Sequence, residues 1–365
     1  MMKIKEIIAV IEELAPVSYQ ESYDNTGMQI GNPDKEINSV LLTLDVTEKV
    51  VSEAIGKKAG LIISHHPVIF GQINKISGHT VAERIIIKAI KNDIAIYSCH
   101  TNLDSTWNGL NIKLAEKLGL TDVKILKPVT GTLKKIVTFV PTEYAEKLRI
   151  ALFNAGAGQI GNYDSCSYNI EGKGTYKAGE NTTPFIGKKG ELHTEPEIRI
   201  ETIFPLHLKN NILAALIANH PYEEVAYDIY SLDNSFNRQG IGAIGSFQDA
   251  IDERIFLSQI KHTLNCKFIK YSALTGKKIK KVAVCGGSGS SLISDALALN
   301  ADAFITADLK YHQFQEPENK MLLVDAGHFE TEYHALEIFY ELIIKKFPTF
   351  ALYFSKANIN PVNYL

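Results

Sequence analysis

The stretch "LIISHHPVIF", residues 61–70, indicates the type of fold most directly. Leu61–Ser64 is short, apolar and rich in β-branched residues, which predicts a buried strand. His65 and His66 follow at its carboxyl end, and Pro67 ends the regular pairing because proline has no N–H to donate. Two adjacent imidazoles at a strand end fit a metal site, a catalytic pair or an ordinary polar surface. The rest of the sequence is needed to choose among these three.

Working outward, apolar runs of strand type alternate with helical patterns. A strand and a helix with Thr47 as N-cap precede the histidines, and a helix over 80–92 and a strand in "DIAIYSCHTNLD", 93–104, follow them. The same alternation returns in "KKVAVCGGSGSSLISDALALN", 280–300, and in 320–347, a strand followed by a long helix. This pattern predicts an α/β core with a mixed, largely parallel sheet and helices on both faces.

The middle of the chain, residues 130–245, has a different order of predicted strands and helices. Its runs follow the order βαββαβ, which is typical of a ferredoxin-like α+β unit. Glycine-rich stretches flank it on both sides. We therefore expect an α/β core formed by 1–129 and 246–365, interrupted by an inserted domain over 130–245.

The composition is that of an ordinary globular protein, with 45% hydrophobic and 22% charged residues over 365 residues. A net charge of −3 gives no general attraction to nucleic acid or to anionic membranes. The four cysteines are widely separated, which argues against a zinc knuckle and a secreted disulfide framework. The first residues are typical of a surface helix, and no apolar run is long enough to cross a bilayer, so we expect a cytoplasmic protein.

Three segments of the core carry metal-ligand residues just after a predicted strand. They are His65 with His66, His100 with Asp104, and His328 with Glu332. One such residue alone usually means no more than a polar surface. Because ligands bind at the carboxyl ends of the strands in open α/β sheets, we expect the three segments to converge at one edge. Together they predict a metal site.

Neighbouring side chains on a strand point to opposite faces, so His65 and His66 are poorly placed to grip one ion. Two ions, each taking one histidine, resolve this, and Glu332 is the candidate for a carboxylate that bridges them. Imidazole and carboxylate ligands suit Zn, Mn, Fe, Co or Ni, and the ligand set alone does not choose among them. The lack of cysteine ligands argues against a purely structural zinc site.

Other motifs are weaker. "GAGQIG", 156–161, fits the dinucleotide-binding pattern but stands between a helix and a strand, the reverse of the required order. "CGGSGSSL", 285–292, is either a tight strand-to-helix turn or an anion site. Lys310 and His312 either face the metals as substrate contacts or proton carriers, or belong to a solvated turn. Asp24 fits an Asx-type turn.

Taken in order, "YDNTGMQIG", "SHHPVIF", "HTNLD", "TADLKYH" and "GHFETE" resemble the NGG-interacting-factor-three-like family. Its bacterial members are labelled homologues of type two GTP cyclohydrolase I. The resemblance covers about 1–128 and 246–365, and "HPYEEVAYDI" in the insert is similar to the family's extra domain, related in shape to PII and CutA proteins. One departure is Ala307, where the family more often has glycine.

The resemblance implies an α/β core with two divalent ions per chain, zinc first among the candidates, in a ring-shaped homohexamer. The implied ligands are His65, His66, Asp104, His328 and Glu332, with His100 at the site and with Asp24 and Asn25 at its rim. It further implies a metal-dependent hydrolase whose hydroxide attacks the purine C8 of GTP and opens the ring with loss of formate, so that the expected partner is a nucleotide or another small phosphorylated substrate. The alternative is a regulatory or scaffold protein with structural metals and a ligand-sensing insert.

Overall fold

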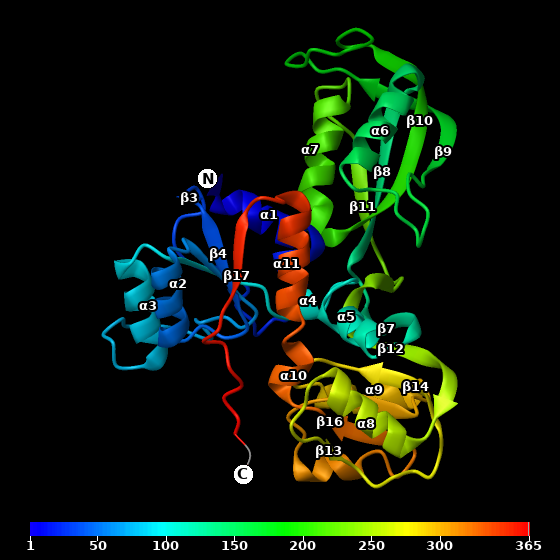
Figure 1. Cartoon of the computed structure of the whole chain (residues 1–365). Coiled ribbons are helices and arrows are strands. Elements are labelled where there is room, and N and C mark those ends of the chain that lie inside the picture. The colour runs from blue at the N-terminus through cyan, green and yellow to red at the C-terminus, as the bar shows by residue number, and fades with distance from the viewer. Residues whose placement is uncertain (364) are drawn as a thin grey trace. The chain divides into compact units, whose positions relative to one another are not determined.

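The computed structural model describes residues 1–363 and 365, and the chain divides into two compact units. The first unit consists of Met1–Pro128 and Arg238–Leu365, and the second of Val129–Asn237, which interrupts the first (Figure 1). Within the described residues, no helix is long and apolar enough to cross a membrane.

The first unit contains a five-stranded sheet with the order β17-β4-β5-β6-β2. Its first four strands run parallel, and β2 is antiparallel to β6. The strands are β2 (Gly27–Ile30), β4 (Ser39–Thr43), β5 (Leu61–Ser64), β6 (Ala95–Ser98) and β17 (Ala351–Phe354). The strand predicted at 61–64 is therefore present as β5, with parallel neighbours on both sides.

Helices cover both faces of this sheet because its central strands are apolar on both sides. Val40 and Ile63 face α1 (Ile4–Leu14) and α11 (Ala335–Lys346), while Leu41 faces the opposite layer. That layer is formed by α2 (Glu48–Lys57) and α3 (Val81–Lys91), which begin at the N-caps Thr47 and Thr80. A small antiparallel pair, β1 (Met2–Lys3) and β3 (Glu36–Ile37), lies beside α1.

The first unit also contains a six-stranded sheet with the order β13-β16-β15-β14-β12-β7. Strands β14, β15 and β16 are parallel, and β12 and β13 are antiparallel additions. The strands are β7 (Thr121–Val129), β12 (Phe236–Ile251), β13 (Lys270–Tyr271), β14 (Ile279–Val284), β15 (Ala303–Thr306) and β16 (Leu322–Asp325). Helices α5 (Leu110–Lys117) and α8 (Glu253–Thr263) pack on one face, and α9 (Ile293–Ala298) packs on the other.

The flanking segments thus build two mixed sheets where the sequence analysis expected one. β5 and β6, which precede the histidines at 65, 66 and 100, belong to the five-stranded sheet. β16, which precedes His328, belongs to the six-stranded sheet. The predicted long helix after β16 is two helices, α10 (His328–Glu332) and α11. The chain turns between them because α10 follows the second sheet while α11 packs in the core of the first. The candidate ligands therefore come from two sheets.

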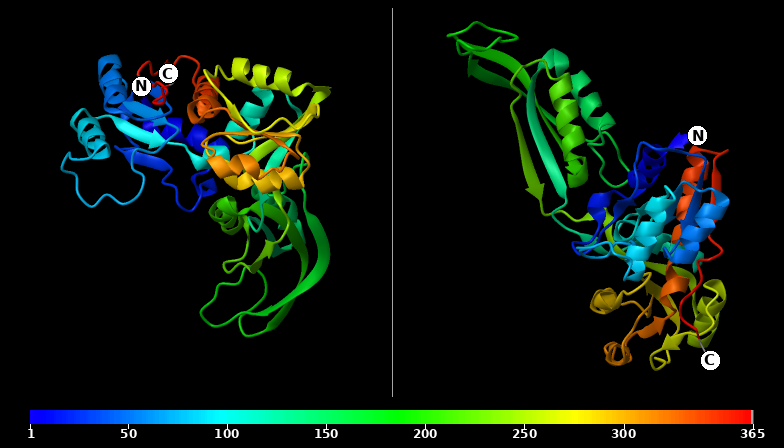
Figure 2. Two further views of the ribbon diagram at one scale, coloured as in Figure 1. Left: turned by 90° about the horizontal axis from the view of Figure 1, so that it is seen from below. Right: turned by 90° about the vertical axis from the view of Figure 1, so that its left-hand side faces the viewer.

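The second unit is built on a four-stranded antiparallel sheet with the order β11-β8-β10-β9. Its strands are β8 (Leu133–Pro141), β9 (Tyr168–Lys177), β10 (Leu192–Pro205) and β11 (Tyr227–Leu232). Helices α6 (Ala145–Asn154) and α7 (Lys209–Asn219) lie on the same face of this sheet (Figures 1 and 2). Along the chain the elements follow the predicted order βαββαβ.

Candidate metal centre

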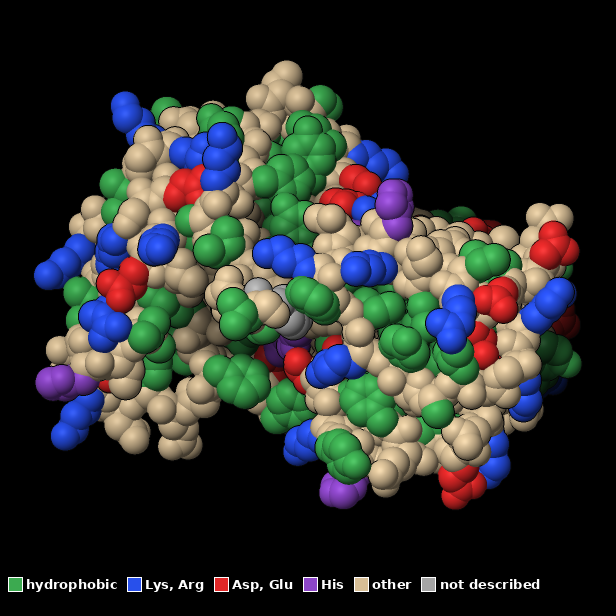
Figure 3. All heavy atoms as spheres, turned by 60° about the horizontal axis from the view of Figure 1, so that its bottom comes forward, with side chains coloured by type: hydrophobic (Ala, Val, Ile, Leu, Met, Phe, Trp, Pro, Cys, Tyr) green, Lys and Arg blue, Asp and Glu red, His purple; other side chains and the backbone are tan. Residues whose placement is uncertain are grey.

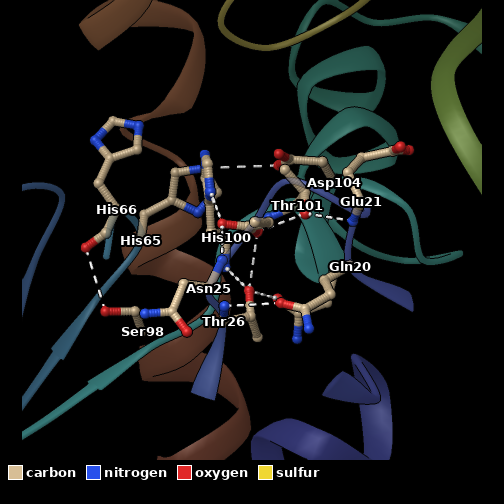
Figure 4. A network of polar contacts seen from close by, with 12 residues as sticks. Gln20, Glu21, Asn25, Thr26, His65, His66, Ser98, His100, Thr101 and Asp104 are labelled. Carbon is tan, nitrogen blue, oxygen red and sulfur yellow. Dashed lines mark hydrogen bonds and ion pairs between the residues drawn. The ribbon is translucent and has the colours of Figure 1, made fainter. Parts of the chain in front are cut away.

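The six candidate ligands of the sequence analysis gather in the first unit. Figure 3 shows histidine and acidic side chains together in a hollow of the surface, and Figure 4 shows part of the cluster from close by. Two overlapping groups of ligand atoms lie within 4.8 Å of one another and could hold a metal ion: His65, His66 and His100, and His66, His328 and Glu332. Asp104 joins them from the short helix α4 (Thr101–Asp104).

His65 is fully buried at the end of β5. Its Nδ1 lies 2.9 Å from the carbonyl oxygen of Cys99, and since a carbonyl only accepts, Nδ1 carries the proton. The unprotonated Nε2 then points at two carboxylate oxygens, 3.6 Å from Asp104 Oδ1 and 3.8 Å from Glu332 Oε1. This is the tautomer that a metal-ligating histidine needs.

His66 and His328 meet at the other oxygen of Glu332. Their Nε2 atoms lie 2.9 and 2.8 Å from Glu332 Oε2 and 3.3 Å from each other. The four-residue spacing of His328 and Glu332 brings both to one side of α10, as expected if the segment is helical. Ser64 donates to the His66 carbonyl at 2.8 Å, which holds the histidine backbone at the strand ends.

Three aspartates orient the outer nitrogens of three histidines. Nδ1 lies 2.8 Å from Asp45 Oδ1 in His66, 2.8 Å from Asp24 Oδ1 in His100, and 2.7 Å from Asp308 Oδ2 in His328. Carboxylates behind ligating histidines fix their ring orientation and raise their basicity.

Asp45 and Asp308 were not predicted from the sequence, whereas Asp24 was expected in an Asx-type turn, with a place at the rim of the site implied by the family resemblance. A signal was present for the first two, because each lies two residues past a parallel strand, Asp45 after β4 and Asp308 after β15. These strands are direct neighbours of β5 and β16 in their sheets. Their carboxyl ends therefore share an edge with the ends that carry the histidines.

The residues fit a metal. Among the described residues, His65 Nε2 and Asp104 Oδ1 are buried without a hydrogen-bond partner and lie 3.6 Å apart. Buried polar atoms are normally satisfied, so two partnerless atoms that face each other favour a shared ligand. Two donors about 2.1 Å from one tetrahedral ion lie about 3.4 Å apart, close to the 3.6 and 3.8 Å around His65.

The charges of the cluster support the same conclusion. Burial raises the pKa of Asp104 well above its usual value, and the nearby Glu332 charge raises it further. Burial would also raise the pKa of Glu332, but the surrounding histidines hold it well below its usual value. Burial would lower the pKa of His66, yet the Asp45 and Glu332 carboxylates raise it to about 10. A site that crowds carboxylates in a buried space favours bound positive charge.

The glycine run at 285–292 packs directly against this cluster. A Cβ atom on Gly287 would lie 2.1 Å from Glu332 Oε1, and the residue has a φ of +59°, so glycine is required there. The N–H groups of Gly286, Gly287 and Gly289 already donate to the side-chain oxygens of Asn111, Thr331 and Thr306. The tight-turn interpretation therefore suits this loop better than an anion site.

Lys310 and His312 lie at the start of the 3-10 turn Tyr311–Gln315, and both are exposed. Within the described part of the chain, neither side chain makes a hydrogen bond or an ion pair with the cluster. The backbone N–H of Lys310 donates to Gln313 Oε1 at 2.8 Å, which fixes the turn. Ala307, the departure noted from the family pattern, is buried and donates its N–H to the Gly287 carbonyl.

Comparisons with known proteins point in one direction. Residues 2–361 match the model of the family Duf34/NIF3 (NGG1p interacting factor 3). A "GTP cyclohydrolase 1 type 2 homolog" from Bacillus subtilis is 38% identical over 371 residues, covering 99% of this chain and 98% of the relative. A relative with the same description from Halalkalibacterium halodurans is 42% identical over 327 residues, covering 88% of this chain and 87% of its own length.

Solved structures agree over the full length. The crystal structure of a Bacillus cereus protein related to NIF3 superposes with a TM-score of 0.87 at 38% identity, covering 100% of this chain and 99% of that one. The Staphylococcus aureus protein SA1388 superposes with a TM-score of 0.78 at 27% identity, with coverage of 100% and 99%. With a family match over nearly every residue and relatives of this similarity, the chain belongs to the Duf34/NIF3 (NGG1p interacting factor 3) family.

Proposed function

We propose that this protein is a dinuclear metal-dependent hydrolase that acts on a nucleotide, as the name of its curated relatives suggests for GTP. The observation that carries the proposal is the placement of Glu332. Its Oε1 lies 3.8 Å from His65 Nε2, which also lies 3.6 Å from Asp104, and its Oε2 faces His66 and His328. One buried carboxylate between two ligand groups is the arrangement that a bridged pair of ions requires.

In this proposal His65 and Asp104 would hold one divalent ion, His66 and His328 would hold the other, and Glu332 would contribute to both. His100 completes the wall of the site beside His65 and His66. Bound divalent ions would supply Lewis acidity, activating water near neutral pH and polarising the substrate. Zinc is the first candidate, with Mn, Fe, Co and Ni as alternatives, because imidazole and carboxylate ligands suit all of them.

The chain's own residues prepare the site. The Cys99 carbonyl and the three aspartates hold every imidazole in one orientation, so little reorganisation is needed when ions bind. The exposed fraction of the side chain is 0% for His65 and 37% for His328. Substrate would therefore approach from the His328 side. Lys310, two residues beyond Asp308, is our candidate for a phosphate contact, and His312 for a proton carrier.

Three wider expectations belong to the same proposal. We assign the second unit to a ferredoxin-like, PII/CutA-type inserted domain, because its sheet order β11-β8-β10-β9 and its two helices on one face match that topology. We further propose a toroidal homohexamer and a cytoplasmic location. Sedimentation velocity of the purified protein tests the assembly.

The deciding experiment combines metal analysis with product detection. The purified protein is loaded with each candidate metal and incubated with a panel of nucleoside triphosphates, and formate and ring-opened product are measured. We expect about two ions per chain and metal-dependent formate release from GTP.

Glu332→Gln is the matched control, because it keeps the size of the side chain and removes the charge between the ions. This variant should lose at least one ion per chain and all formate release, with its fold retained. Two ions per chain without turnover of any nucleotide would contradict the hydrolase and favour a regulatory or scaffold protein. A fully loaded Glu332→Gln variant would show that Glu332 is not a ligand.

A further inference from the structure

The second unit contains a cavity of about 580 Å³ on the face of its sheet opposite the helices. On β10, Ile198 and Ile200 pack in the core beneath α6 and α7, so Glu197 and Arg199 point to the other face. Further lining residues come from two loops: Ala178, Gly179, Thr182, Pro184 and Phe185 from the first, and Tyr222, Glu223, Glu224 and Ala226 from the second. A volume of this size is in the range that holds small organic molecules.

Two glycines form part of the cavity floor. Gly172 and Gly174 pair with Glu197 and Glu195 across the β9–β10 ladder, so both lie on the cavity face. A Cβ atom at position 174 would lie 2.0 Å from Glu197 Oε2. The carboxylate therefore lies over the backbone of β9, and side chains larger than glycine would close this space.

Glu197 is a buried carboxylate with one oxygen left over. The residue is 8% exposed, and its Oε1 accepts the hydroxyl of Tyr222 at 2.9 Å. Among the described residues, no hydrogen bond or ion pair reaches Oε2. This oxygen is therefore free to accept a hydrogen bond from a ligand in the cavity.

Arg199, two residues further along the same strand, has a hydrogen-bond donor without an acceptor. Its Nη2 pairs with Glu201 at 2.7 Å, but its Nε is buried and, in the described part of the chain, has no hydrogen-bond partner. Side chains two residues apart on a strand lie about 7 Å apart. The cavity thus presents an unused acceptor and an unused donor at a separation that one small ring can bridge.

Aromatic rings form the walls between these groups. Tyr176 and Tyr222 have ring centroids 5.8 Å apart, and Phe185 lies 6.4 Å from Tyr222. Tyr176 is fixed by the hydrogen bond that its hydroxyl donates to the Ile186 carbonyl at 2.7 Å. Held aromatic faces favour a flat, polarisable ligand over an aliphatic one.

We propose that this cavity binds a planar nitrogen heterocycle that carries N–H donors beside a carbonyl oxygen, as guanine-type bases do. The N–H groups donate to Glu197 Oε2, the carbonyl oxygen accepts from Arg199 Nε, and the ring packs against Tyr176 and Phe185. This site lies wholly within the second unit and uses none of the residues of the metal centre.

Calorimetric titration of the full-length, chelator-treated protein with three nucleosides tests the proposal. Guanosine presents two donor groups and a carbonyl, inosine lacks the exocyclic amine, and adenosine lacks both the ring N–H and the carbonyl. Since a hydrogen bond to a charged group contributes a factor of about 10 to 100, inosine should bind at least about 10-fold more weakly than guanosine, and adenosine more weakly still.

Variants separate this cavity from other sites. Glu197→Gln should weaken guanosine binding at least about 10-fold, and so should Tyr176→Leu, which removes a wall. Glu195→Gln is the matched control, because Glu195 shares the strand and the face of Glu197 but pairs with His193 outside the cavity. It should bind guanosine like the parent protein.

Glu332→Gln, in the metal centre, should also bind guanosine normally, so failure of the hydrolase proposal leaves this test intact. Equal affinity for the three nucleosides, no guanosine binding at millimolar concentration, or unchanged binding by both folded cavity variants would each overturn the proposal. Loss of binding in Glu332→Gln with retention in Glu197→Gln would assign the ligand to the metal centre instead.

Discussion

The contact between Gly287 and Glu332 allows the proposed bridging carboxylate to be displaced without changing any ligand. In Gly287→Ala, the added Cβ would lie 2.1 Å from Glu332 Oε1, whereas real Cβ atoms essentially never come within 3.0 Å of another heavy atom. The carboxylate or the loop must therefore shift by about 0.9 Å, which exceeds the tolerance of about 0.5 Å that a preorganised site allows.

Two effects of this substitution have to be separated. The left-handed backbone of Gly287 costs an alanine about 1–2 kcal/mol of stability, whatever the space around it. Gly276→Ala is the matched control, since its φ is +73° and a Cβ there meets nothing within 4 Å. The control should lose the same stability and keep its metal, so the difference between the two variants isolates the clash.

We expect Gly287→Ala to bind metal at least about 10 to 100 times more weakly, because disturbing even the supporting shell of a metal site costs that much. Metal content after dialysis, competition with a chromophoric chelator and thermal unfolding measure the three quantities. If Gly287→Ala kept parental metal affinity and melted like Gly276→Ala, Glu332 Oε1 would not be a ligand and the bridging argument would fail.

Three further predictions concern the aspartate that orients His328, the second unit and the stability of the protein at low pH. Asp308→Asn should weaken metal affinity about 10- to 100-fold, because His328 loses the carboxylate that orients it; an unchanged chelator competition curve would contradict this. Replacing residues 130–236 with a short Gly/Ser linker should leave metal content per chain intact, and an insoluble product would show that the units share a core. Hydrogen bonds led by those from Ser77 hold the pKa of Glu83 at about 2, so its stabilising effect should be complete above pH 4.5 and lost as the pH falls toward 2. The gap in urea midpoint between the parent and Glu83→Gln should narrow over that range, and a constant gap would refute the assignment.

Local sequence patterns predicted local elements well. The apolar run at 61–64 is β5, and the elements of the second unit follow the predicted order βαββαβ. Thr47 caps α2 by accepting the Val50 N–H, as its position before a helical pattern predicted. These features depend on neighbours in sequence, which periodicity and capping rules describe directly.

Features that depend on distant packing were harder to predict. Strands alternating with helices do not reveal that the chain forms two sheets, because either arrangement satisfies the same apolar runs. The break between α10 and α11 has no proline or glycine to mark it; the turn falls at Tyr333 and His334, where the chain passes from one sheet to the other. The end of α10 is therefore set by packing against distant parts of the chain and not by a local sequence signal.

The candidate site shows the same division. His65, His66, His100, Asp104, His328 and Glu332 were found from the sequence because each follows a strand, and the structure brings them together. Asp45 follows its strand in the same way, yet one carboxylate after a strand is too common to single out. Only the contact of 2.8 Å between Asp45 and His66 in the folded chain separates it from other surface acids.

The charges of the cluster favour a bound cation. Five carboxylates, of Asp24, Asp45, Asp104, Asp308 and Glu332, surround four histidines. With neutral histidines and every carboxylate ionised, the cluster would carry five negative charges. The raised pKa values of His66 and His328, about 10 and about 9, describe how the protein alone would offset this charge, by holding protons.

Protons and metal ions would thus compete for the same nitrogens. Two dications bring four positive charges, as many as four protonated imidazoles, but they also satisfy the lone pairs that the histidines turn toward each other. Protonated imidazoles with Nε2 atoms 3.3 Å apart repel, whereas two neutral imidazoles at that distance can share one ion. In the proposed two-metal site, the same number of charges would therefore stabilise the cluster better as metal than as protons, because of the short distance between these nitrogens.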